Sequence, residues 1–306
     1  MRRRFLLVGA LLMLAVTGIE VPPVAAQTAS GHTADITVSP TGITAPDTLP
    51  TGSVTLDVST NDPDGAWLVL VRLNPDMPLE TYLDNLRTAY GDDEEAALVA
   101  RRSIAAGVQM LGGAILSDIP ASVTTIVTPG VHYLVDIQDA TEPDLAERVR
   151  PVRVVPVRAE DVSQPQQAPA LLTMVDTEDG PRFRVPERLV ANRPIIMLNR
   201  GDQPYEAILA PVRPGTTPED LDEFFGSLDD SRPAQTQPPF IGDGTGSSPL
   251  SPDRLMTFEA ELPPGDYAII SWVADLATGR ISSALGLHAL VTIVDPAAEA
   301  AAESAP

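Results

Sequence analysis

The sequence predicts a mainly β protein made of two tandem β-sandwiches, each with a short helical insertion. Three observations predict this class. Short runs of alternating apolar and polar residues recur along the chain, Pro and Gly separate them at turn positions, and the order of runs and turns occurs twice. A chain of 306 residues is long enough for two domains of ordinary size, so two copies explain the order better than one large domain does.

Residues 1–26 have the pattern of a signal peptide. A basic start precedes an apolar run that is short for a membrane span, and small residues end the segment at Ala26. The alternative is an uncleaved anchor, which Pro22 and Pro23 disfavour because they end the helix. We therefore expect a secreted or extracytoplasmic mature chain, with no stable membrane insertion after cleavage.

The first sandwich is expected over residues 34–157. Asp35–Val38 begins it, and Trp67–Val71 is apolar on both faces, which is typical of a central strand. Pro78 can begin a helix, and Glu94–Met110 is expected to be helical or irregular before a Gly112-Gly113 turn. Later strands are expected at Val123–Val127, Val131–Ile137 and Val152–Val157.

The second sandwich is expected over residues 173–295, after a linker at 158–172 that is rich in Gln, Pro and acidic residues. The predicted tail is the Ala- and Glu-rich segment 296–306, expected to be disordered. The predicted equivalents between copies are Arg182–Val185 with Asp35–Val38, the helix Pro218–Phe225 with the helix after Pro78, and Gly242–Gly244 with Gly112-Gly113.

A turn and strand within Leu262–Leu287 organise the second copy. Alternation places Tyr267, Ile269 and Ser271 on one face of the strand, with Ala268, Ile270 and Trp272 on the other. The residues expected to be largely buried in apolar strand runs are Trp67, Leu70, Val135, Ile208, Ile269 and Val291.

Composition excludes several functions. A formal net charge of −22 argues against nucleic acid and anionic membrane surfaces as partners. The absence of Cys excludes disulfides, thiolate metal sites and a cysteine nucleophile. We expect no cofactor.

Several turns of the second copy, taken together, form a pattern. They are Asn199-Arg200-Gly201, Tyr205-Glu206, Gly215-Thr216-Thr217, Leu262-Pro263-Pro264-Gly265-Asp266-Tyr267, Ser271 with Asp275, Gly279-Arg280-Ile281-Ser282 and Gly286-Leu287. This pattern resembles bacterial exported cupredoxin-like domains of the plastocyanin and azurin type. The resemblance covers about residues 173–294 and, more weakly, 34–157. It implies a Greek-key β-sandwich for each copy.

The resemblance also implies where copper ligands would lie, and the residues there are unsuitable. The four positions fall on Tyr205, Ser271, Ser282 and Leu287, whereas a type 1 copper site needs imidazole nitrogens and a thiolate. The first copy has Ala66 and Asp136 at the first two positions. We therefore expect a vestigial site without a metal, with hydroxyl groups and Leu287 filling the space.

Three histidines remain. His32 is expected in a flexible start, and His132 is expected to be a capped or half-exposed strand residue. His288 follows the last ligand position and could turn into the old site, although a structural role at the sheet edge is favoured.

The preferred function is therefore an exported, non-catalytic module that binds a protein or a surface, with the partner not readable from sequence. The alternative is a metal-handling or electron-transfer protein with a non-standard site around His288, Tyr205 and carboxylates. A hydrolase using Ser271 or Ser282 with His288 and Asp275 ranks third, because no nucleophile elbow or oxyanion loop accompanies these residues.

Overall fold

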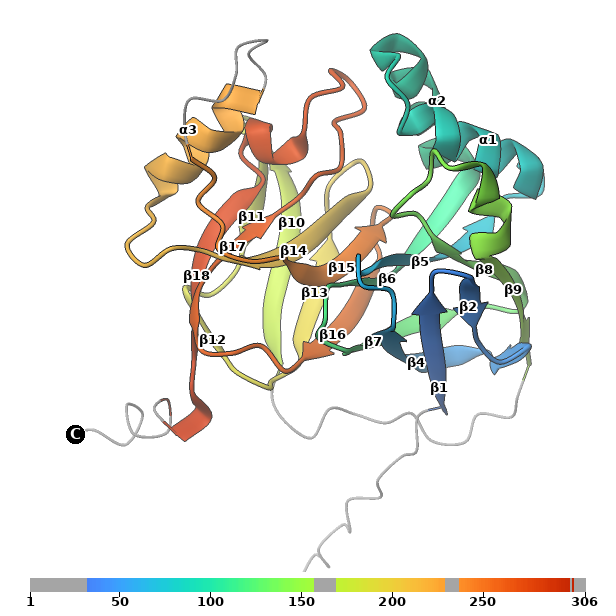
Figure 1. Ribbon diagram of the computed structural model, residues 1–306, viewed down its shortest axis with the longest axis horizontal. Helices are drawn as coiled ribbons and strands as arrows, with labels where there is room; N and C mark the ends of the chain where they lie inside the picture. Colours follow the sequence, from blue (N-terminus) through green and yellow to red (C-terminus); the bar gives the residue numbers. More distant parts are fainter. Residues whose placement is uncertain (1–31, 157–168, 229–236, 298, 300–306) are drawn as a thin grey trace, which may run out of the picture.

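The computed structural model describes residues 32–156, 169–228, 237–297 and 299. The predicted signal peptide, most of the predicted linker and most of the predicted tail lie outside these residues. The described chain is mainly β, as predicted, and its strands form an eight-stranded and a ten-stranded sheet with a common core between them (Figure 1).

Within the described residues, the first half contains nine strands and two α-helices, and the second half nine strands and one α-helix. In the first half these are β1 (His32–Ser39), β2 (Gly42–Thr44), β3 (Thr48–Pro50), β4 (Gly52–Thr60), β5 (Ala66–Leu73), α1 (Leu79–Ala89), α2 (Glu94–Gly107), β6 (Val108–Leu116), β7 (Ala121–Val127), β8 (Gly130–Asp136), the 3₁₀ helix η1 (Pro143–Arg148) and β9 (Val149–Val155). In the second half they are β10 (Ala170–Thr177), β11 (Gly180–Arg184), β12 (Arg188–Val190), β13 (Ile195–Asn199), β14 (Tyr205–Pro211), α3 (Pro218–Leu228), β15 (Thr245–Leu250), β16 (Leu255–Ala260), β17 (Gly265–Ile270), the 3₁₀ helix η2 (Ser282–Leu285) and β18 (His288–Val294).

The two halves have the same strand order. The eight-stranded sheet runs β11-β10-β13-β16-β7-β4-β1-β2, and the ten-stranded sheet runs β12-β18-β17-β14-β15-β6-β5-β8-β9-β3. Each strand of the first half corresponds to the strand numbered nine higher in the second half. Exchanging corresponding strands and reading each sheet from its other end gives the same order again. The halves meet where β16 pairs with β7 and β15 pairs with β6, both antiparallel. Both sheets are therefore continuous from one half to the other.

Strand alternation divides the apolar residues between three clusters. Tyr267 and Ile269 of β17 face the core between the sheets, while Ala268 and Ile270 face outward and are covered by α3. The corresponding outer face of the first half lies under α1 and α2. The helical insertions of both halves therefore cover the same side of the ten-stranded sheet (Figure 1).

Local sequence explains the helix starts. Pro78 stands just before α1, where its missing N–H is not needed. Asp93 caps α2 by accepting the Ala96 N–H at 3.0 Å. Thr217 and Asp220 bond one another's backbone N–H groups at the start of α3, the arrangement of a capping box.

The start of the second half was assigned incorrectly. The strand equivalent to β1 is β10, which begins at Ala170, so three residues of the predicted linker belong to it. Arg182–Arg184 lies in β11, the equivalent of β2, rather than in the first strand. The short apolar run after Pro169 begins β10 and pairs with β13, and the strand pairs with β11 from Thr173 onward. His32 likewise lies in β1 and not in an irregular start.

The Gly-rich segments were also assigned incorrectly. Gly112 and Gly113 lie inside β6, and a Cβ on Gly113 would stand 2.1 Å from a backbone oxygen of β5. Their counterpart is β15, which includes Thr245 and Gly246 rather than a turn. Close approach of a neighbouring backbone explains Gly113 and Gly246, and the side chains of Met256 and Leu250 fill the space beside Gly112, so turn formation explains none of them.

Five of the six predicted core residues are buried. Trp67 is only partly buried, because its side chain faces outward beside the helices rather than into the space between the sheets.

Candidate functional site

Tyr205, the first predicted ligand position, is engaged in a polar network. It opens β14, is buried, donates its hydroxyl hydrogen to Asp176 Oδ1 at 2.7 Å and accepts from Gln203 Nε2 at 3.1 Å. Burial, followed by Asp176, raises the pKa of Tyr205, so the phenol stays neutral. Gln203 also accepts the Leu276 N–H at 2.7 Å, which joins this phenol to the loop after β17.

The other three predicted positions are buried and linked through backbone groups. Ser283, which was not predicted, accepts the Ser271 N–H at 2.8 Å, and its oxygen lies 2.9 Å from Ser271 O and 3.0 Å from Leu287 O. Ser282 donates to Val273 O at 2.7 Å, while the buried Ser271 hydroxyl has no partner among the residues described. The hydrogen bonds of Ser282 and Ser283 therefore hold the segment between β17 and β18 closed over Ser271 and Leu287.

His288 faces α3 instead of the predicted ligand positions. Its Nδ1 lies 3.0 Å from Ser283 O, its Nε2 lies 3.1 Å from Asp222 Oδ1, and its ring stacks on Phe225 with centroids 5.5 Å apart. Both ring nitrogens therefore have partners. A metal ion could bind this ring only by displacing one of them.

The residues at the predicted positions do not suit a copper ion. Two serine hydroxyls, a neutral phenol and Leu287 supply neither imidazole nor thiolate. Over the described ranges, no three His, Asp or Glu side chains are grouped to hold a metal. The arrangement does not suit the hydrolase alternative either, because Asp275 accepts from Thr278 and neither Ser271 nor Ser282 is bonded to His288.

His132 differs from expectation. It is fully buried on β8, on the same face as Leu134, and neither ring nitrogen has a partner in the described part of the chain. Burial lowers the pKa of His132, which favours the neutral ring. Alternation had placed it on that face correctly. The error was to treat the face as half-exposed.

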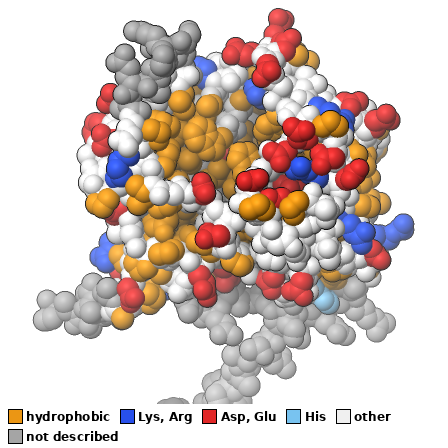
Figure 2. All heavy atoms as spheres, viewed as in Figure 1, with side chains coloured by type: hydrophobic (Ala, Val, Ile, Leu, Met, Phe, Trp, Pro, Cys, Tyr) orange, Lys and Arg blue, Asp and Glu red, His pale blue; other side chains and the backbone are white. Residues whose placement is uncertain are grey.

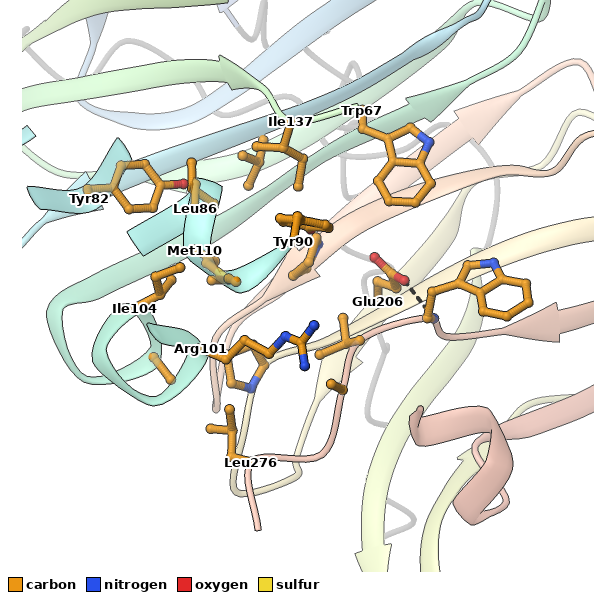
Figure 3. A pocket seen from close by; sticks show the side chains of 18 residues that line it. Trp67, Tyr82, Leu86, Tyr90, Arg101, Ile104, Met110, Ile137, Glu206 and Leu276 are labelled. Atoms are coloured by element: carbon orange, nitrogen blue, oxygen red, sulfur yellow. Dashed lines mark hydrogen bonds between the residues drawn. The ribbon is translucent and has the colours of Figure 1, made fainter. Parts of the chain in front are cut away.

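The clearest concavity lies where the two halves meet the helical pair (Figure 3). It encloses about 180 Å³ and is walled mainly by apolar and aromatic side chains. Its walls include the side chains of Trp67, Tyr90, Arg101, Glu206, Trp272 and Leu276. Arg102 joins the walls, because it donates to Leu276 O at 2.6 Å and Ala277 O at 3.1 Å. We call this concavity the junction pocket.

Glu206 supplies a carboxyl group to the junction pocket. It lies on β14, is 3 % exposed and accepts the Trp272 N–H at 2.8 Å. Burial raises the pKa of Glu206 to about 7, although the N–H groups of Trp272 and Val273 partly oppose the rise. At neutral pH this group is therefore divided between its charged and protonated forms.

Arg101 and Tyr90 bring polar atoms to the same space. Figure 3 shows the Arg101 guanidinium and the Glu206 carboxyl directed toward the middle of the pocket, near Tyr90. Tyr90 is 45 % exposed, yet desolvation on its pocket side and then Glu206 raise its pKa, whereas Arg101 lowers it, so the phenol lies close to both charged groups. No ion pair joins Arg101 to Glu206 or to any other described residue.

A wider groove adjoins the junction pocket, and Trp67 and Trp272 line both. We call it the acidic groove. Its volume is about 1570 Å³, and its apolar residues include Ile115, Phe240 and Ile241. Of the described residues, five acidic ones and no Arg or His line it, and the acidic ones are Asp62, Asp64, Asp118, Asp243 and Asp266. Figure 2 shows apolar side chains gathered on this face over β14 and β17, with acidic side chains nearby.

Sequence reasoning missed both concavities. Glu206 belongs to the Tyr205-Glu206 pair of the sequence pattern. Its burial depends on the helices that cover β14, and strand alternation alone does not reveal that cover. Arg101 of the first half and Glu206 of the second half line one pocket only because the halves share a sheet, and no local pattern encodes that pairing.

In the comparisons, no family model and no curated protein match the chain. Among solved structures it is similar to auracyanin from Roseiflexus castenholzii, at 10 % identity over 42 % of this chain and 99 % of that one, with a TM-score of 0.25. It is also similar to auracyanin A, a blue copper protein from Chloroflexus aurantiacus (13 % identity, 42 % and 100 % coverage, TM-score 0.24). A third is the Cu-containing nitrite reductase of Thermus scotoductus SA-01 (12 % identity, 87 % and 61 % coverage, TM-score 0.23). At these values the likeness gives no basis for an activity or a metal site in this chain. Within the described residues, no helix is long and apolar enough to cross a membrane.

Proposed function

We propose that this chain is a non-catalytic binding protein, acting in a secreted or extracytoplasmic location, whose acidic groove holds a basic polypeptide segment with an apolar anchor. The observation that carries the proposal is the composition of the groove. Among the residues that the structure describes, it has an apolar floor, five carboxylates around it and no cationic side chain in its lining.

The apolar floor supplies the affinity. Ile241 is 62 % exposed, and Trp67, Phe240 and Trp272 are only partly buried, so apolar surface remains in contact with water. Aromatic side chains at the centre of an interface commonly contribute most of its binding energy. An apolar anchor on the partner gains free energy by covering this surface.

The acidic residues determine which partners the groove prefers. Carboxylates of one sign around a concavity raise the local concentration of cations and disfavour acidic partners. The net charge of −22 extends the same preference over the whole molecule. A segment that carries Lys or Arg on either side of an apolar anchor therefore fits, whereas nucleic acid does not.

A peptide-binding experiment tests this proposal. The probe is a short synthetic peptide with a Leu-Trp-Leu anchor flanked by Lys, titrated against the full chain without residues 1–26 by calorimetry. Saturable one-to-one binding is expected, and it should weaken steeply with salt because exposed charges are screened beyond about 10 Å at 0.1 M. Replacing Lys by Glu in the peptide, or the anchor by Ser, should abolish binding.

Matched variants locate the site. Asp64→Asn, Asp118→Asn and Asp243→Asn together should weaken binding at least tenfold, and Ile241→Ser should weaken it without changing its salt dependence. The control removes three exposed carboxyls elsewhere, by Asp76→Asn, Asp92→Asn and Glu178→Gln, and should have little effect. Equal losses from both triple variants, or binding of the Lys-to-Glu peptide, would overturn the proposed site.

A further inference from the structure

The junction pocket is too small for a polypeptide segment and has its own chemistry. Its volume of about 180 Å³ is comparable to an engineered apolar cavity of about 150 Å³ that binds benzene. A molecule with one ring, or a short branched chain, and one polar group therefore fits.

The polar atoms of the pocket define that polar group. Arg101 is half-buried, points into the pocket and has no hydrogen-bond or ion-pair partner among the residues that the structure describes. A guanidinium binds a carboxylate through two parallel hydrogen bonds, a geometry that suits a carboxylic acid ligand. The Glu206 carboxyl is already engaged, because it accepts backbone N–H groups from the segment after β17.

We infer that the junction pocket binds a small apolar monocarboxylate, with its carboxylate on Arg101 and its apolar part against the aromatic and aliphatic walls. This inference is independent of the acidic groove, since it concerns different charged residues and a different ligand class. The walls are held together by the contact of Arg102 with the loop at Leu276. The pocket therefore exists before the ligand arrives.

Glu206 makes this binding dependent on pH. A charged Glu206 repels a bound carboxylate, whereas a protonated Glu206 does not and can donate a hydrogen bond. The other titratable or charged groups lining the pocket are Tyr82 and Tyr90 from α1 and its C-terminus and Arg101 from α2. Burial raises the pKa of Tyr82, and desolvation of its ring followed by Glu206 raises the pKa of Tyr90 even though that residue is 45 % exposed, so both phenols stay neutral below pH 8. Only Glu206 changes charge there among these four.

Binding can be followed with the two tryptophans of the chain, because Trp67 and Trp272 are its only ones and both line the pocket. The probe is phenylacetate, with hexanoate as a second carboxylate, and benzylamine and phenylalanine as comparison ligands. The protein is the full chain without residues 1–26, and calorimetry gives the stoichiometry. One-to-one binding of a carboxylate is expected, tighter than that of either amine-bearing ligand.

Variants separate the roles of the two charged groups. Arg101→Met keeps the apolar stem and should weaken phenylacetate binding at least tenfold, while Arg101→Lys should retain part of it. Arg87→Met, on the surface of α1 and paired with Asp84, is the matched control and should change nothing.

Affinity of the unaltered protein should fall about tenfold between pH 6 and pH 8, because the form that binds is the one with a neutral Glu206. Glu206→Gln should bind with little pH dependence.

Four results would count against carboxylate binding in the junction pocket. Failure of both carboxylates to bind at millimolar concentration overturns the inference, as does binding that Arg101→Met leaves unchanged. Preferential binding of benzylamine would assign the pocket to cations instead, and preference for phenylalanine would assign it to zwitterions. Peptide binding in the acidic groove should be unaffected by Arg101→Met, so the two proposals can fail separately.

Discussion

The two halves satisfy the same backbone hydrogen bond in different ways. In the first half, Asp136 of β8 accepts the Trp67 N–H at 3.0 Å. In the second half, Glu206 of β14 accepts the Trp272 N–H at 2.8 Å. The strand β5 corresponds to β14, and β8 corresponds to β17. The tryptophan lies on β5 in the first half but just after β17 in the second, and the carboxylate lies on β8 in the first half but on β14 in the second.

The charge around the two carboxylates also differs. Burial raises the pKa of Asp136, but backbone N–H groups and Arg148 oppose the rise. Glu206 has only backbone N–H groups to oppose burial. The comparison teaches that the same hydrogen-bonding role can be filled in one half by an acid whose pKa rise is opposed by a nearby cation, and in the other by an acid beside a pocket, whose pKa rise no such cation opposes.

The largest effect is expected from the common core. Leu134→Ala and Ile269→Ala truncate fully buried residues on the equivalent strands β8 and β17, and each should lower the free energy of unfolding by about 2–5 kcal/mol. Because both sheets cross between the halves, each variant should unfold in a single transition. Denaturant unfolding monitored in Trp67→Phe and Trp272→Phe backgrounds reports on each half. Two separate transitions would show that the halves are energetically independent.

The second effect concerns pH. The Glu206 pKa is about 7 in the folded protein against an ordinary value of 4.5, so the unfolded chain loses this proton first as the pH rises. The free energy of unfolding should therefore fall between about pH 4.5 and 7, by on the order of 3 kcal/mol in total from this group. Urea unfolding at several pH values should show a smaller decline in Glu206→Gln. An unchanged decline would contradict the assignment, and Glu219→Gln, on exposed α3 surface, is the control.

The third effect is a difference in stability between variants of two buried serines. Ser283→Ala removes the acceptor for the Ser271 N–H and should cost about 1–3 kcal/mol. Ser271→Ala removes a hydroxyl without a described partner and should leave stability unchanged or raise it slightly. Thermal unfolding of the two variants measures the difference. A larger loss from Ser271→Ala would indicate a partner for that hydroxyl.

The smallest effect is expected from copper. Tyr205, Ser271, Ser282 and Leu287 offer no copper-binding set, and a ligand stabilises only as far as it occupies the folded state. The melting temperature should therefore be the same with Cu²⁺ and with a chelator. A rise with stoichiometric copper that His288→Ala abolishes would support the metal-handling alternative and would make the second half chemically distinct from the first.

The fold class was predictable because strand alternation and turn residues are local. The faces of β17 were assigned correctly from Tyr267 to Ile270, and the helix starts at Pro78 and Pro218 were found within one residue. The start of β10 was not found, because the short apolar run that begins it is a strand only through its pairing with β13. The division into two domains at residues 158–172 stays a prediction.

The candidate site was predictable only in part. The unsuitability of Tyr205 and the serines for copper follows from chemistry alone. The position of His288 against Phe225 and Asp222 does not, because it depends on how α3 packs. The junction pocket needs α1, α2 and the second half together, so it is a property of tertiary structure.

The strand pairs that join the halves have a consequence for quaternary structure. A single half, taken alone, would expose β6 and β7 as two unpaired edges, and such edges favour pairing with another chain. The intact chain covers each edge with its counterpart from the other half, so it resembles a two-fold dimer whose protomers are joined covalently. A protease cut between residues 157 and 168 would therefore leave two fragments held together by backbone hydrogen bonds and the common core, and they should migrate as one particle until denatured.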